Sequence, residues 1–154
     1  DGKTRWYDGI VDHVILGALP DERHIQGMLK DGNKLAVLNM VAEWNGHAEL
    51  YDKHNIEQLH LKVVDFTAPT VEELQRAVEW VQDKVSQKTT VCIHCKAGKG
   101  RSATVALAYL VAVHKMQPDE AQRLLLEKRP QVLRALTQRP EVKAFCALYA
   151  GTEE

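Results

Sequence analysis

The sequence has 154 residues, of which 45% are hydrophobic and 27% are charged, the ordinary balance of one globular domain. Its formal net charge of -1 argues against bulk nucleic-acid binding, which usually needs a strongly basic face. No apolar run approaches the roughly 18 residues that a membrane-spanning helix requires. We therefore expect a single domain over residues 1–154 that is soluble as it stands.

The first half of the chain alternates short apolar runs with polar and turn-forming residues. An apolar run at residues 14–16 predicts a strand, and residues 35–40 predict a second one. A third strand is expected at residues 59–63, where apolar side chains alternate with polar or smaller neighbours. Two short helices are expected between these strands, at residues 28–29 and 48–54.

Capping residues and a continuous apolar strand mark the second half. Thr70 and Glu73 form a capping box that is followed by apolar residues at helical spacing, so a helix is expected to begin there. Residues 89–94 are β-branched and almost continuously apolar, which is typical of a central strand covered on both faces. Residues 101–115 are apolar nearly all round and predict a helix that runs through the core.

The order of these elements predicts the fold class. Two further helices are expected to begin at Pro118 and Pro140, and Gly151 is expected to cap the second of them. Strands that alternate with helices predict an α/β fold, with a central mostly parallel sheet of four to five strands flanked by helices on both faces. The order of elements is also compatible with one edge strand that runs antiparallel.

The most informative segment, residues 94–102, lies between the expected central strand and the core helix. Open α/β sheets bind ligands beyond the carboxyl ends of their strands. The five residues between Cys95 and Arg101 include two glycines, so their backbone N–H groups can converge on an anion, and the next helix adds its positive N-terminal end. The pattern predicts a phosphate site built from Lys96, Ala97, Gly98, Lys99 and Gly100.

Four side chains have predicted roles in a phosphoryl-transfer reaction. Cys95 is the predicted nucleophile, because the same donors would lower its pKa below the usual value of about 8.5. Arg101 is predicted to bind two phosphoryl oxygens through its planar guanidinium, and Ser102 to donate its hydroxyl to the sulfur. Asp65, which follows the third strand, is the predicted general acid, because Thr70 already caps the next helix.

Other sites built on the same residues fit the pattern less well. Taken singly, a buried cysteine or a glycine-rich loop is more often structural. A Walker loop needs Ser or Thr after its lysine, whereas Lys99 precedes Gly100. Cys92 lies back in the strand, roughly 10 Å from Cys95, which is too far for a disulfide, and a reducing compartment is the simpler interpretation. Cys146 alone does not complete a zinc site, and we expect no metal and no cofactor.

The residues described so far resemble the protein tyrosine phosphatase superfamily, in its small dual-specificity branch, through the spacing from Cys95 to Arg101 and the separate upstream acid. Over nearly the whole chain the sequence is similar to the mitochondrial phosphatidylglycerophosphate phosphatase family. The segments that carry this similarity are Trp6-Tyr7, Leu16-Gly17-Ala18-Leu19-Pro20, Asn39-Met40, Val64-Asp65-Phe66-Thr67, His94-Cys95-Lys96-Ala97-Gly98 and the tail from Gln117-Pro118 through Lys128-Arg129-Pro130. The resemblance implies a lipid phosphatase on the route to cardiolipin, at the matrix side of the inner mitochondrial membrane.

The charges beside the loop bear on the substrate. Exposed lysines are usually solvated, but Lys96 and Lys99 next to Arg101 favour a headgroup with a second phosphate. The leading hypothesis is the conversion of phosphatidylglycerophosphate to phosphatidylglycerol. The alternatives are a phosphoinositide phosphatase, a dual-specificity phosphoprotein phosphatase and a non-catalytic phosphate-binding module. We expect a monomer whose partner is an anionic phospholipid headgroup or membrane surface, with no nucleic acid. The aromatic residues that could touch such a surface are Trp6, Tyr7 and Trp44.

Overall fold

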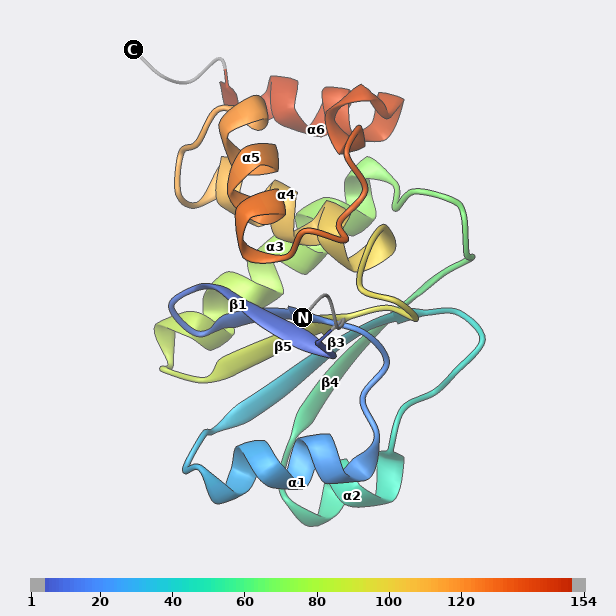
Figure 1. Cartoon of the computed structure of the whole chain (residues 1–154), viewed down its shortest axis with the longest axis vertical. Helices are drawn as coiled ribbons and strands as arrows, with labels where there is room; N and C mark the ends of the chain where they lie inside the picture. Colours follow the sequence, from blue (N-terminus) through green and yellow to red (C-terminus); the bar gives the residue numbers. More distant parts are fainter. Residues whose placement is uncertain (1–4, 151–154) are drawn as a thin grey trace.

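A five-stranded sheet forms the centre of the computed structural model, which describes residues 5–150 (Figure 1). The spatial order of the strands is β1-β2-β5-β3-β4. Strands β2, β5, β3 and β4 are parallel, and β1 pairs with β2 in the antiparallel sense at one edge. The strands are β1 (Tyr7–Val11), β2 (Val14–Gly17), β3 (Leu35–Val41), β4 (Glu57–Val63) and β5 (Thr90–His94).

Helices cover both faces of this sheet, so the predicted α/β class and the mostly parallel sheet with one antiparallel edge strand are confirmed. In Figure 1, α1 and α2 lie on one face and the remaining helices on the other. The helices are α1 (Glu22–Lys30), α2 (Ala48–Lys53), α3 (Val71–Ser86), α4 (Arg101–Ala112), α5 (Pro118–Lys128) and α6 (Pro140–Ala150), with a 3-10 turn η1 (Leu136–Gln138) before α6.

The core lies in two layers that the sheet separates. The smaller layer joins α1 and α2 to side chains such as Val37 and Cys92. The larger layer is centred on α4, in which every residue from Arg101 to Ala112 is buried. The contacts of α4 with the sheet and with α3, α5 and α6 explain why its sequence is apolar nearly all round.

Several expected boundaries differ from those observed. Strand β1 was not predicted, because Asp8 and Gly9 interrupt its apolar pattern. Helix α1 begins soon after Asp21, where His24 takes the position usually held by Glu or Gln in a capping box, and it is much longer than expected. Helix α4 ends at Ala112 rather than near residue 115, and Lys115 adopts a left-handed backbone conformation. The expected cap Gly151 lies outside the described residues.

The parallel arrangement brings four strand ends to one edge of the sheet. Cys95 follows β5, Glu43 follows β3 closely and Asp65 follows β4, so residues far apart in the sequence meet there. The capping box at the start of α3 is present as predicted, with Thr70 N–H donating to Glu73 at 2.8 Å. Within residues 5–150, no helix is both long and apolar enough to cross a membrane.

Candidate active site

The backbone carbonyls of the loop between β5 and α4 accept hydrogen bonds from other parts of the chain. Four consecutive carbonyl oxygens of this loop accept hydrogen bonds from neighbouring segments, two of them from a single arginine. The pairs are Lys96 O with Leu19 N (3.1 Å), Ala97 O with Arg129 Nη2 (3.1 Å), Gly98 O with Arg129 Nε (2.9 Å) and Lys99 O with Leu133 N (2.9 Å). Because the carbonyls are held on the outside, backbone N–H groups of the loop are free to face the inside, which is the geometry of an anion site.

Cys95 lies on the inner side of this loop and is almost fully buried. Its Sγ accepts a hydrogen bond from Gly98 N–H at 3.3 Å and lies 3.0 Å from Ser102 Oγ. Burial opposes ionisation, but hydrogen bonds from Ser102, Gly98 and Gly100 together lower the pKa of the Cys95 thiol below its ordinary value. By contrast, burial raises the pKa of Cys92 to about 12 and also raises that of Cys146. All three cysteines are free thiols, and only Cys95 has an environment that favours the thiolate.

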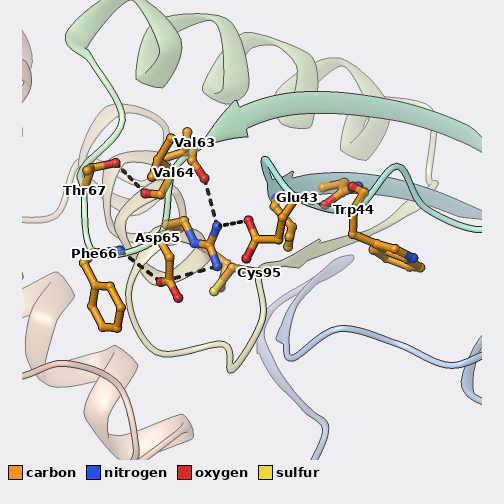
Figure 2. A network of polar contacts seen from close by, with 12 residues as sticks. Glu43, Trp44, Val63, Val64, Asp65, Phe66, Thr67 and Cys95 are labelled. Atoms are coloured by element: carbon orange, nitrogen blue, oxygen red, sulfur yellow. Dashed lines mark hydrogen bonds and ion pairs between the residues drawn. The ribbon is translucent and has the colours of Figure 1, made fainter.

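The guanidinium of Arg101 is buried and held from two sides. Its Nη1 donates to the backbone carbonyl of Val63 at 2.8 Å and to Glu43 Oε1 at 3.2 Å, and its Nη2 lies 3.4 Å from Asp65 Oδ1. Both Glu43 and Asp65 form ion pairs with this guanidinium, and Figure 2 shows their carboxylates near the sulfur of Cys95. A backbone N–H of Glu43 itself, and then Arg101, lower the pKa of the Glu43 carboxyl, so it is ionised at neutral pH. Glu43 and Val63 therefore orient the arginine.

Asp65 is carried by a tight turn that follows β4. Thr67 N–H donates to Val64 O at 3.1 Å and closes the turn. Asp65 Oδ1 accepts from Phe66 N–H at 3.0 Å, a bond marked in Figure 2. Phe66 adopts a positive φ of 67°. The Asp65 side chain is 42% exposed, so its carboxylate faces both the guanidinium and the solvent, where a substrate would enter.

A cleft of about 330 Å³ brings the predicted nucleophile, arginine and acid together. Asp65, Cys95 and Arg101 line it with most of the predicted loop, namely Lys96, Ala97, Lys99 and Gly100. Gly98 and Ser102 lie behind the sulfur and contact it instead. All nine residues selected from the sequence therefore belong to one site, although their chemical roles stay predictions. Within residues 5–150, no three His, Cys, Asp or Glu side chains gather as they would around a metal ion.

Two buried charges behind the loop were missed by sequence analysis. Arg129 is fully buried, and its Nη1 donates to Asp8 Oδ2 at 2.8 Å and to Arg5 O at 3.0 Å. Asp8, in β1, is also buried and thus neutralises the arginine that holds the loop carbonyls. Asp8 and Arg129 lie near opposite ends of the chain, and neither stands in a motif that predicts this pairing.

His94, the residue before Cys95, is fully buried. Burial is the main reason why its pKa is lowered to about 4, so the ring is neutral at physiological pH. Its Nδ1 lies 3.3 Å from Cys95 O and donates to it, which leaves Nε2 as an acceptor without a hydrogen-bond partner in the described part of the chain. The ring also packs against Trp44, with their centroids 5.7 Å apart.

The three aromatic residues considered for membrane contact are half-buried. Trp6 stacks on His24 with ring centroids 4.5 Å apart and lies against Tyr7, and both pack on the smaller core layer. Trp44 packs against His94 and the larger layer. Their contacts account for their positions as packing, and the exposed apolar side chains of the structure lie elsewhere.

Comparison with known proteins finds a matching family model and similar relatives over most of the chain. Residues 16–145 match the family model described as "Dual specificity phosphatase, catalytic domain". The chain is 36% identical over 133 residues to human "Phosphatidylglycerophosphatase and protein-tyrosine phosphatase 1", covering 82% of the chain and 66% of that protein. It is 32% identical over 140 residues to "Phosphatidylglycerophosphate phosphatase PTPMT1" of Arabidopsis thaliana, covering 90% of the chain and 42% of that protein. The chain thus spans about two thirds of the human relative and less than half of the plant one.

A solved structure is similar over the same region. The crystal structure described as "PTPMT1 in complex with PI(5)P" superposes with a TM-score of 0.80 at 28% identity, covering 96% of this chain and 96% of that one. The shared fold therefore includes the sheet, the loop after β5 and the helices behind it.

Proposed function

Because this chain belongs to the dual specificity phosphatase family, we propose that it hydrolyses the phosphomonoester of phosphatidylglycerophosphate through a phosphocysteine formed on Cys95. The observation that supports this most is the meeting of three groups in one cleft: a thiol with a lowered pKa, a buried guanidinium and a half-exposed carboxyl. A non-catalytic phosphate-binding module would need the anion site, but would need neither the thiolate nor the acid.

In the first half of the proposed cycle, the Cys95 thiolate attacks phosphorus in line with the bond to the leaving alcohol. The S–P bond forms as the P–O bond breaks, and Asp65 gives its proton to the departing oxygen. Arg101 and the inward N–H groups of the loop stabilise the charge on the equatorial oxygens. Positioning and electrostatic stabilisation supply most of the rate enhancement in such a step.

In the second half, Asp65 is a carboxylate and takes a proton from a water molecule that attacks the phosphocysteine. The S–P bond breaks, inorganic phosphate forms and Cys95 returns as a thiolate. The Ser102 hydroxyl, 3.0 Å from the sulfur, stabilises the thiolate as it leaves. Asp65 ends the cycle protonated and ready for the next substrate.

The charge around the cleft supports a substrate with a second anionic group. Lys96, Lys99 and Arg139 line it beside Arg101, and Asp65 is the one carboxylate among its described lining residues. Arg139 Nη1 is buried and has no hydrogen-bond partner within residues 5–150. The phosphodiester of phosphatidylglycerophosphate would supply an acceptor for these cations, which an isolated phosphomonoester lacks.

The names of the relatives favour the same lipid, since the human and plant relatives are named for phosphatidylglycerophosphate or its phosphatase. The human name also includes protein-tyrosine phosphatase, and the solved neighbour was crystallised with PI(5)P. We propose a mitochondrial location, at the matrix side of the inner membrane, from the family resemblance. Imaging of the full-length protein with organelle markers tests this location independently of the activity.

A substrate panel tests the proposed activity. Phosphatidylglycerophosphate, several phosphoinositides and a phosphotyrosine peptide are presented in the same detergent micelles, and released phosphate is measured. We expect the highest kcat/KM for phosphatidylglycerophosphate, no turnover with Cys95→Ser, and an unchanged melting temperature for that variant. Asp65→Asn should slow the lipid far more than an activated aryl phosphate, whose leaving group needs no proton. A preference of orders of magnitude for the peptide would overturn the lipid assignment, and full activity of Cys95→Ser would overturn the mechanism.

A further inference from the structure

Exposed apolar side chains are concentrated beside the candidate active site. Among the described residues, the well-exposed large hydrophobic side chains are Val64 (63%), Phe66 (94%), Leu133 (42%) and Leu148 (52%). Phe66 and Leu133 line the cleft, and Val64 immediately precedes Asp65 in the acid-bearing turn. Only Leu148, on α6, belongs to another part of the described surface.

The backbone conformation at Phe66 sets the exposure of its side chain. Its positive φ of 67° is uncommon for a bulky residue, and the bonds from Phe66 N–H to Asp65 and from Thr67 N–H to Val64 hold the turn in this conformation. Figure 2 shows the Phe66 ring projecting from the turn. A phenyl ring that stays in water adds no hydrophobic stabilisation to the fold. The exposure of Phe66 therefore indicates an apolar partner outside the chain.

The charges around these side chains indicate the chemistry of that partner. Lys96 and Lys99 are exposed at the cleft and form no ion pair with any residue that the structure describes, and Arg139 adds a third cation. Apolar side chains among unpaired cations are complementary to an anionic bilayer, which offers hydrocarbon below and negative headgroups above. Three separate side chains are too little surface for a stable protein interface.

We propose that Val64, Phe66 and Leu133, here called the docking rim, insert into an anionic phospholipid bilayer and so place the cleft over the headgroups. This inference rests on the proposed function, because a lipid phosphatase must reach its phosphomonoester at the surface of a bilayer. Since Phe66 is hydrogen-bonded to Asp65 through its N–H, insertion of the rim also anchors the turn that holds the acid. The membrane thus both captures the enzyme and fixes its general acid.

Binding to vesicles tests the docking rim without any turnover. The probes are phosphatidylcholine vesicles with and without phosphatidylglycerol, and bound protein is measured by co-sedimentation. We expect binding only to the anionic vesicles, weakening with salt, and a loss of roughly tenfold or more in partitioning for the Phe66→Ser, Leu133→Ser double variant. Leu148→Ser is the control, since it removes an exposed apolar side chain from another surface, and it should bind like the wild type. Equal binding of the rim variant and the control variant would overturn the inference.

A fluorescence variant tests insertion without removing apolar surface. Phe66→Trp should give a blue-shifted emission that is quenched by brominated lipid in anionic vesicles, and Leu148→Trp should give neither change. The signal of unsubstituted protein is subtracted to remove the native tryptophans. Emission from Phe66→Trp that stays unquenched in the vesicle-bound protein would contradict insertion.

An activity comparison separates failure of the rim from failure of the proposed function. Short-chain phosphatidylglycerophosphate below its micelle concentration is compared with the long-chain lipid in vesicles. Val64→Ser should reduce the vesicle rate far more than the rate on the dispersed lipid, because its side chain does not line the cleft. Equal rates for Val64→Ser and wild type on both substrates would count against the rim. Rim-dependent vesicle binding without hydrolysis of either lipid would instead refute the proposed function and leave the docking surface standing.

Discussion

Arg129 Nε donates to the backbone carbonyl of Gly98 at 2.9 Å and thereby ties the end of α5 to the loop between β5 and α4. The same guanidinium reaches Ala97 O and is neutralised by Asp8. Arg129 does not line the cleft, so we expect it to affect the reaction only by holding the carbonyls of the loop away from a bound anion. We therefore regard it as a positioning residue.

We predict that Gly98→Ala disables the loop. A Cβ at this position would lie 2.7 Å from Arg129 Nη2 and 2.7 Å from Gly17 O, and the φ of +71° is unfavourable for alanine. The loop must therefore shift, and kcat/KM should fall roughly tenfold to a hundredfold, a loss of about 1.4–2.8 kcal/mol in transition-state stabilisation. Steady-state kinetics measure this, and Gly27→Ala is the control, because its Cβ would meet nothing.

Arg129→Lys should also lower the activity, but for a different reason. Lysine keeps the charge beside Asp8, but cannot donate to two carbonyls with the geometry of the planar guanidinium. We expect a lower kcat together with a raised pKa for alkylation of Cys95 by iodoacetate, because the loop N–H groups no longer converge on the sulfur. A loss of stability with an unchanged alkylation profile would mean that Arg129 has only a structural role.

The ionisation of Cys95 should shape the acid side of the pH–rate profile. The thiolate forms below the ordinary cysteine pKa because hydrogen bonds from Ser102, Gly98 and Gly100 outweigh burial. In the wild type kcat/KM should rise with pH as the thiolate forms, and Ser102→Ala should move this rise to higher pH, because one stabilising donor is lost. The rate of iodoacetate alkylation against pH gives the same pKa without turnover, with Cys95→Ser as the blank.

Coincident profiles for Ser102→Ala and wild type would contradict the assigned hydrogen bond. The two other cysteines do not interfere near neutral pH, because burial raises the pKa of both. If breakdown of the phosphocysteine also needs the hydroxyl, Ser102→Ala should show a burst of leaving alcohol before the steady state.

The sequence was sufficient for the local features of the site and insufficient for its long-range supports. The loop from Cys95 to Arg101 could be predicted because its spacing, its glycines and its place between a strand and a helix are all contiguous. Asp65 could be predicted because it follows a strand that had to end at the same edge. Glu43 and Arg129 could not, because their partners are set by tertiary contacts across the sheet and between opposite ends of the chain. No periodicity encodes such contacts.

In the fold, too, local features could be predicted from the sequence and long-range contacts could not. The core helix α4 and the central strand β5 follow from continuous apolar character, because each is covered on all sides. Strand β1 was missed because Asp8 is an interior charge, and the alternating pattern of a half-buried strand assumes that charges face water. The residue that hides the strand is also the one that neutralises Arg129 behind the active-site loop.

We predict that Arg139 recognises the second anionic group of the substrate. Arg139→Gln should raise KM about tenfold or more for the deacylated headgroup of phosphatidylglycerophosphate, since a charge-assisted hydrogen bond is worth about 1.5–3 kcal/mol. For glycerol phosphate, which has the same phosphomonoester but no diester, KM should change little. Arg134→Gln is the control, because Arg134 is exposed and lies outside the cleft lining. Equal effects of Arg139→Gln on both substrates would assign Arg139 to the phosphomonoester instead.

The buried neutral His94 should make stability depend on pH in a defined window. The pKa of His94 is about 4 in the folded protein, whereas that of an ordinary histidine is 6.5. Above pH 6.5 His94 is therefore neutral in both the folded and the unfolded protein, and it contributes no pH dependence to stability. Between pH 6.5 and 4 the unfolded chain binds a proton that the folded protein does not, so the free energy of unfolding should fall as pH falls, by up to about 3 kcal/mol. Below pH 4 this contribution levels off.

Urea unfolding at several pH values measures this dependence. His94→Asn keeps a donor for Cys95 O, and it should lose the part of the slope of unfolding free energy against pH that His94 causes, while the contributions of other groups stay the same. Parallel curves for the two proteins would show that His94 is already protonated, or solvated, in the folded state.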